Sequence, residues 1–174
     1  MMRSLIHRSR RLAALALVSG VLACATARTS LTTPAHAEAP LTARATGTFE
    51  VKINPQPVDD YTDATMLGRL TIDKQFHGDL EATSKGQMLT GGAVAKGSAG
   101  YVAIERVSGT LGGRRGTFIL QHSGTMTRGA PQLLVTVVPD SGTDELTGLT
   151  GAMTIDVTGG KHAYAFSYAL PAAP

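Results

Sequence analysis

Apolar and polar side chains alternate along most of the chain after residue 45, with the two-residue period of β-strands and no convincing helical period. The alternation is clearest between Tyr101 and Met126, where two strand-like runs flank the glycine-rich segment 112–116. Such a segment between runs rich in β-branched and aromatic residues is the signal for a β-hairpin. We therefore expect a hairpin here, and the rest of the fold can be arranged around it.

The register of this hairpin decides which side chains share a face. A turn centred on Gly113 and Arg114 would place Glu105 opposite His122. Because successive side chains of a strand point to opposite sides, the apolar residues then gather on one face. That face comprises Tyr101, Ala103, Glu105, Val107, Phe118, Leu120, His122 and Met126. We expect it to be buried.

Two further hairpins follow along the chain. A turn at Arg128 and Gly129 leads to a strand over 132–138, in which Leu133, Val135 and Val137 would extend the same apolar face. The last hairpin turns at 158–161. It predicts three neighbouring cross-strand pairs: Met153 with Phe166, Ile155 with Tyr164, and Val157 with His162.

Three earlier runs, over 46–53, 65–76 and 80–90, bring the count to about eight strands. Many short strands with frequent turn signals and no helices indicate a barrel or a sandwich. Closure of a sequential meander removes its exposed edges. The chain is therefore predicted to be all-β, a small antiparallel eight-stranded barrel. The interior of such a barrel is either filled by side chains or wide enough for one small ligand.

The first residues are expected to be a signal peptide and not part of the fold. Several arginines precede an apolar run over 12–23, which has about the length of a signal-peptide core and is too short for a transmembrane helix of roughly 20 residues. The small residues Ala35 and Ala37 supply a cleavage pattern, so we place the mature start at Glu38. We expect export, either secreted or periplasmic.

This interpretation divides the chain into a signal peptide (1–37), a tether (38–44) and a β-barrel domain (45–170). Two alternatives for the leader remain. Cys24 ends a loose lipoprotein motif and would then carry the lipid, whereas Arg10 and Arg11 hint at twin-arginine export.

Removal of the leader changes the charge of the protein. Five of the 16 basic residues and none of the 13 acidic ones lie in residues 1–37, so the remainder carries 11 against 13, a net charge of −2. A nucleic-acid partner would require a basic surface on the mature domain, and we expect no such partner. The single cysteine, Cys24, also lies in the leader. The mature domain therefore has no disulfide.

Four segments resemble a bacterial family described as a domain of unknown function. They are GTFEVK (47–52), FHGDLEA (76–82), YVAIERVSGTLGGRRGTFILQHSGTM (101–126) and VVPDSGTDELTGLTG (137–151). The resemblance covers nearly all of residues 45–170 and implies an eight-stranded barrel of the allene oxide cyclase-like or calycin-like type. It implies no reaction. The chain has Asp140 and Asp144 where the family pattern has glycine.

Glu105 and His122 are the candidate catalytic residues. A carboxylate and an imidazole together on an apolar face could form a general acid–base pair with pKa values shifted by burial. The alternative is a buried polar pair that satisfies itself and fixes the strand register. The candidate ligand-binding residues are Tyr101, Phe118, Tyr164 and Phe166, for which simple burial in a core is the competing explanation.

No motif indicates a cofactor or a metal. His77, His122 and His162 lack ligand spacing, and there is no nucleophile elbow or phosphate loop. The leading hypothesis is a protein that holds a small apolar ligand in the barrel. The alternatives are an isomerase or cyclase resembling allene oxide cyclase, and a structural or interaction barrel with a filled core. Neither the ligand nor the oligomeric state follows from the sequence.

Overall fold

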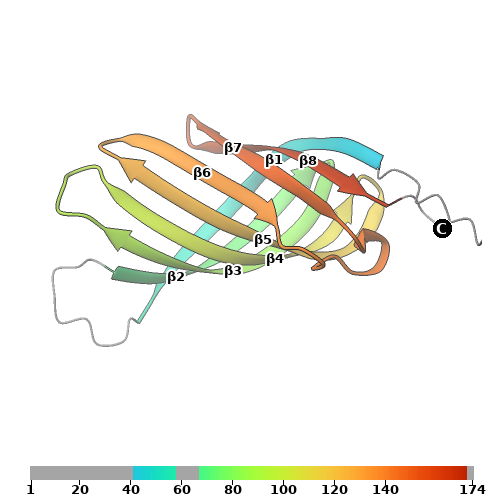
Figure 1. Cartoon of the computed structure of the whole chain (residues 1–174), viewed down its shortest axis with the longest axis horizontal. Helices are drawn as coiled ribbons and strands as arrows, with labels where there is room; N and C mark the ends of the chain where they lie inside the picture. Colours follow the sequence, from blue (N-terminus) through green and yellow to red (C-terminus); the bar gives the residue numbers. More distant parts are fainter. Residues whose placement is uncertain (1–40, 58–66, 172–174) are drawn as a thin grey trace, which may run out of the picture. The chain divides into compact units, whose positions relative to one another are not determined.

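The structure of the chain, a computed structural model, describes residues 41–57 and 67–171. These residues form a closed barrel of eight antiparallel strands in sequential order (Figure 1), which confirms the predicted all-β barrel. The strands are β1 (Leu41–Gln56), β2 (Leu67–Gly78), β3 (Leu80–Gly92), β4 (Ala99–Leu111), β5 (Arg114–Thr127), β6 (Ala130–Val137), β7 (Thr150–Thr158) and β8 (Lys161–Leu170). A short 3₁₀ turn, η1 (Asp144–Leu146), lies between β6 and β7.

Every strand pairs with its neighbour in sequence, and β1 closes the barrel against β8. The seam between β6 and β7 is the thinnest, with a single aligned pair, Thr136 and Ala152. Most of the facing edges of β6 and β7 therefore have no aligned partner, although the sheet is closed. Among the described residues, no helix is long and apolar enough to cross a membrane.

The register predicted for the β4–β5 hairpin was wrong by two residues. Leu111 pairs with Arg114, so Glu105 lies opposite Leu120, and His122 lies opposite Ala103. The turn consists of Gly112 and Gly113, with φ of 54° and 84°. Two successive residues with positive φ give the two-residue turn that suits strand twist, and the glycine pair adopts it at little cost. A two-residue shift keeps every side chain on its predicted face.

The registers predicted for the two later hairpins are confirmed. On β6, the apolar residues pair as expected: Val137 with Leu120, Val135 with His122, and Leu133 with Gly124. On β7 and β8, Met153 pairs with Phe166, Ile155 with Tyr164, and Val157 with His162. For the β5–β6 and β7–β8 hairpins, the sequence therefore predicted correctly both the face on which each side chain lies and the residue opposite it.

The start of β1 differs from the predicted boundary. Residues 41–44 pair with the end of β8, so the strand begins inside the segment assigned to the tether. The predicted leader, residues 1–37, lies outside the described residues, as does the start of the run predicted over 65–76.

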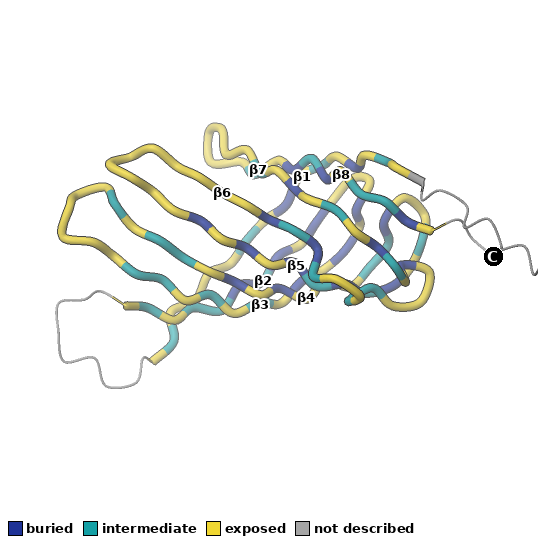
Figure 2. The backbone as a smooth tube through the Cα atoms, viewed as in Figure 1, coloured by how far each residue is buried: buried dark blue, intermediate teal, exposed yellow. Residues whose placement is uncertain are grey.

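Buried side chains are concentrated in one half of the barrel. The end that carries the β2–β3 turn, the β4–β5 turn and η1 is filled, and we call it the closed half. The strand ends near the β3–β4, β5–β6 and β7–β8 turns are largely exposed (Figure 2); we call this the open half. The closed half is filled by Phe76, Leu80, Leu111, Phe118, Leu120, Leu146, Leu149, Phe166 and Leu170.

The segment around η1 covers the closed end of the barrel. Leu146 is fully buried, and the Thr143 N–H donates to the carbonyl of Thr117 over 2.9 Å. Asp140 and Asp144 both have positive φ, 59° and 54°. Aspartate tolerates this left-handed conformation better than most residues, which explains how the loop is made without glycine at these positions.

Candidate functional site

The open half of the barrel contains a cavity of about 480 Å³ that opens to solvent. Its walls are mainly apolar and come from all eight strands. The apolar wall residues include Val51, Ile53, Ile72, Met88, Met126, Leu133, Ile155 and Val157. Fewer polar side chains reach the cavity, among them Lys74, Thr90, Tyr101, His122, Gln132 and His162. This composition is typical of small-molecule sites, which combine apolar walls with a few placed polar groups.

Lys74 and His122 lie at the floor, where the cavity meets the closed half. Lys74 is only 8% exposed, and its Nζ lies 2.6 Å from Glu105 Oε2. The ammonium group also lies 4.9 Å from the centre of the Phe49 ring and 5.5 Å from that of Phe76. Aromatic faces attract cations electrostatically. An ion pair and two rings therefore fix the position of the charge.

Glu105 lies directly behind this floor and is completely buried. Its Oε1 accepts a short hydrogen bond from Ser84 Oγ, and its Oε2 accepts one from Lys74 Nζ. Burial by itself raises the pKa of Glu105, but His122, Lys74 and Ser84 outweigh it and lower the pKa from 4.5 to about 2. The carboxylate is therefore ionised, and both of its oxygens are engaged.

His122 contacts the same carboxylate but is not well hydrogen-bonded to it. Its Nε2 lies 2.9 Å from Glu105 Oε2, yet Nε2 has no hydrogen-bond partner of acceptable geometry among the described residues. The ring N–H is not directed at the oxygen, and misaligned hydrogen bonds are weak. We therefore treat this contact as an electrostatic one. His122 is 3% exposed and lines the cavity.

The predicted pair of Glu105 and His122 is thus brought together, but not as direct cross-strand neighbours. The two side chains meet diagonally, since Glu105 faces Leu120 across the hairpin. Only His122 belongs to the cavity lining. This arrangement favours an anchoring role for Glu105 over proton exchange with a ligand.

Tyr101 lines the cavity wall, as predicted for a ligand contact. Its ring covers Gly124, where an added Cβ would come within 2.2 Å of the ring. Burial, and to a smaller extent the charge of Glu105, raise the pKa of the Tyr101 hydroxyl. The hydroxyl therefore keeps its proton at neutral pH.

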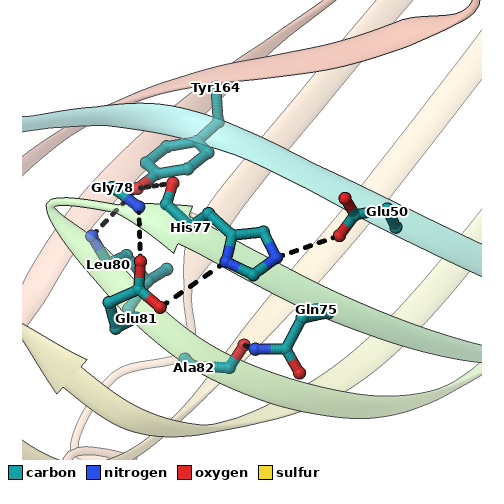
Figure 3. Close-up of polar contacts among 8 residues, drawn as sticks. All are labelled: Glu50, Gln75, His77, Gly78, Leu80, Glu81, Ala82 and Tyr164. Carbon is teal, nitrogen blue, oxygen red and sulfur yellow. Dashed lines mark hydrogen bonds and ion pairs between the residues drawn. The ribbon is translucent and has the colours of Figure 1, made fainter.

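Phe118, Tyr164 and Phe166 do not line the cavity. The rings of Phe118 and Phe166 stack in the closed half with centroids 5.9 Å apart. Tyr164 anchors the β2–β3 turn (Figure 3): its hydroxyl accepts from Leu80 N at 2.9 Å and donates to the His77 carbonyl at 3.4 Å. The structure therefore places all three candidates in the core.

The other two histidines among the described residues have different surroundings. On the outside of the barrel, His77 lies between Glu50 and Glu81, with nitrogen–oxygen distances of 3.1 and 3.6 Å (Figure 3). His162 lines the cavity and stacks on Phe49 with centroids 4.9 Å apart. In the described part of the chain, no group of three or more His, Cys, Asp or Glu residues could hold a metal ion.

Lys74 and Ser84 are the floor residues that sequence reasoning missed. The signal for Lys74 was present, because strand alternation places it on the same face of the strand as the apolar residues Ile72 and Phe76. A lysine among inward apolar residues indicates either that the predicted register is wrong or that the lysine is a buried charge with a partner. Here it is the second, and its partner is Glu105.

The comparisons with known proteins agree with this architecture. The profile of one family, described as a protein of unknown function (DUF3224), matches residues 45–168. The chain is also similar to the crystal structure of a protein with unknown function from the DUF3224 family from Shewanella oneidensis MR-1. The sequence identity is 48% and the TM-score is 0.72, and the match covers 76% of this chain and 100% of that chain. No curated protein matches. The chain therefore belongs to the DUF3224 family of proteins of unknown function.

Proposed function

We propose that the protein binds a small, largely apolar molecule in the open half of its barrel. The observation that carries this proposal is the cavity of about 480 Å³. It lies within the range of about 300–1,000 Å³ that is usual for ligand sites. Lys74 and His122 at its floor add the few polar groups that such sites use to orient a ligand.

Uncovered apolar side chains in the cavity support the same function. Four large apolar residues that belong to its lining are between 43% and 59% exposed: Ile53, Met126, Leu133 and Val157. Covering such surface is favourable by roughly 25 cal/mol per Å². A ligand in the cavity would cover these side chains, whereas a protein whose barrel served only as a scaffold would gain from filling it with larger residues.

Catalysis by an isomerase or cyclase receives less support from this site. Such a reaction needs a group that exchanges a proton with the substrate. Glu105 is enclosed, is ionised with a pKa of about 2, and does not reach the cavity. Tight, specific binding needs no such exchange and is the simpler function for this arrangement.

The binding of N-phenyl-1-naphthylamine, a neutral apolar dye that fluoresces in apolar surroundings, tests the proposal. Met88 lines the cavity, so Met88→Trp should obstruct it and lower dye affinity at least tenfold. Leu89 is the next residue on β3, points outward and is 57% exposed, which makes Leu89→Trp the matched control. The proposal fails if wild type does not bind the dye, or if both variants bind it as wild type does.

We also propose that the protein is exported and that its mature form begins at Glu38. Four arginines ahead of an apolar core, and the small residues at 35 and 37, support this proposal. Expression of the full chain in a bacterial host, followed by N-terminal sequencing of the periplasmic product, tests it. A product that retains Met1 in the cytoplasm contradicts export. A lipid-modified product that disappears with Cys24→Ala identifies the lipoprotein alternative.

A further inference from the structure

The seam between β6 and β7 borders the cavity. Beyond the single aligned pair of Thr136 and Ala152, the two strands continue toward the open half without further aligned residues. Side chains of this stretch, among them Leu133, Ile155 and Val157, line the cavity. Leu133 and Val157 are also exposed to solvent. Two strand edges without aligned partners therefore lie on either side of an apolar space.

The backbone groups of β6 that face the seam follow from the pairing of its other edge. The Val138 N–H donates to the Ile119 carbonyl over 2.9 Å, and in an antiparallel pair such hydrogen-bonded residues recur at every second position. The backbone groups of Leu134 therefore point toward β5, and those of Leu133 point toward β7. Pro131 agrees with this assignment, because its nitrogen also faces the seam and proline is tolerated at a strand edge that needs no donor.

The same reasoning identifies the groups of β7 that face the seam. Thr158 and Lys161 flank the two-residue turn that joins β7 to β8, and residues that flank such a turn form a hydrogen-bonded pair. Thr154 therefore directs its backbone groups toward β8, whereas Ile155 and Val157 direct theirs toward β6. Both edges thus offer N–H donors and C=O acceptors that have no aligned strand partner among the described residues.

An extended backbone is the kind of group that satisfies these two edges. It carries donors and acceptors on both sides at the spacing of a strand, whereas a small molecule with one polar group reaches only part of one edge. Alternate side chains of such a segment would enter the cavity, whose walls are apolar. Recognition by strand addition uses both features, since main-chain hydrogen bonds give affinity and pockets for alternate side chains give specificity.

We propose that the seam binds an extended peptide with apolar side chains at alternate positions, as an additional strand between β6 and β7. This peptide-binding activity goes beyond the proposed function, although the inward side chains of the peptide use the same cavity. Because β6 and β7 are antiparallel, the peptide runs antiparallel to one edge and parallel to the other, and sheets of mixed direction are common. Leu133 contacts its backbone on one side, and Ile155 and Val157 contact it on the other.

Amide hydrogen exchange, followed by nuclear magnetic resonance in the absence of dye, locates the peptide. The probe is acetyl-Val-Thr-Val-Thr-Val-amide. In the free protein the amides of Leu133 and Ile155 should exchange rapidly, and saturating peptide should slow both by about tenfold or more. The neighbouring amides of Leu134 and Thr154 donate to β5 and β8 and are the control, because they should be protected with and without peptide. Protection of Leu133 and Ile155 in the free protein, by each other or by a second copy of the barrel, overturns the inference.

Displacement of N-phenyl-1-naphthylamine measures what the side-chain pattern and the backbone of the peptide contribute. Acetyl-Val-Val-Thr-Thr-Val-amide has the same composition without alternation. It should displace the dye about tenfold more weakly than the probe, as should a probe methylated on the nitrogen of its central valine, since a factor of about ten corresponds to one hydrogen bond. Equal displacement by all three peptides overturns the inference. A probe that neither displaces the dye nor slows exchange also overturns it, while the proposed function stands. Absence of dye binding together with protection by the peptide refutes the proposed function and supports this inference.

Discussion

Lys74→Met should destabilise the protein far more than its loss of contacts would suggest. The substitution keeps the length and most of the volume of the side chain, but it leaves the fully buried carboxylate of Glu105 without its cation. Removal of one partner from a buried ion pair costs about 3–5 kcal/mol. The double variant Lys74→Met/Glu105→Gln should recover a large part of that cost, because no charge then remains buried.

Lys85 provides the matched control, since it forms an ion pair with Asp73 on the outer surface, between the neighbouring strands β3 and β2. The nitrogen–oxygen distances are nearly equal, 2.8 Å for this pair and 2.6 Å for Lys74 and Glu105. The surface pair is open to solvent, with side chains 87% and 40% exposed. Lys85→Met should therefore cost only about 0–1 kcal/mol. The comparison isolates burial as the cause.

Urea unfolding followed by far-ultraviolet circular dichroism measures these free energies of unfolding. Wild type and Lys85→Met should be the most stable and nearly equal. The double variant should be less stable than these two, and Lys74→Met should be the least stable. If Lys74→Met costs no more than Lys85→Met, the floor is not held by a buried ion pair. If the double variant is less stable than Lys74→Met by the full cost of Glu105→Gln, the two residues act independently and the reasoning is refuted.

Three further predictions concern the same barrel. The folded pKa of Glu105 is about 2, against an ordinary value of 4.5. Its ionisation therefore contributes roughly 3 kcal/mol to the free energy of unfolding above pH 4.5, and this contribution is lost as the pH falls toward 2. Urea unfolding measured at decreasing pH should show the loss in wild type, and an equally steep loss in Glu105→Gln would contradict the prediction. Gly124→Ala should displace the Tyr101 ring, which lies 2.2 Å from the added Cβ, and lower both stability and dye affinity; unchanged dye binding and an unchanged melting temperature would refute this placement. Leu146→Ala in η1 removes a buried side chain from the closed half and should cost about 2–5 kcal/mol while dye affinity stays within twofold, whereas a large loss of affinity would contradict the division into two halves.

The strand pattern allowed much of the fold to be predicted from the sequence. Alternation identified the inward face of β4 and β5, because side chains of a strand must point to opposite sides. The alignment of the two strands depended on the turn. The segment 112–116 contains three glycines, and more than one two-residue turn fits it. Only the backbone shows that Gly112 and Gly113 form the turn.

The candidate site was predictable only in part. Glu105 and His122 were identified because polar side chains on an apolar face demand partners. Lys74 was missed because it lies on β2, far in sequence from Glu105 on β4. The two side chains meet across β3, and a contact between strands that are not neighbours cannot be read from local patterns. Phe118 and Phe166 were predicted to contact a ligand because alternation shows which face of a strand a residue lies on. It does not show whether the residue lies in the open half or the closed half of the barrel.

A crystal structure of the protein grown with N-phenyl-1-naphthylamine tests the central claim most directly. We expect the dye to lie in the cavity of the open half, between Met88 and Ile155. Dye bound only on the outer surface of the barrel, or a cavity that remains empty at saturating dye, would contradict the account.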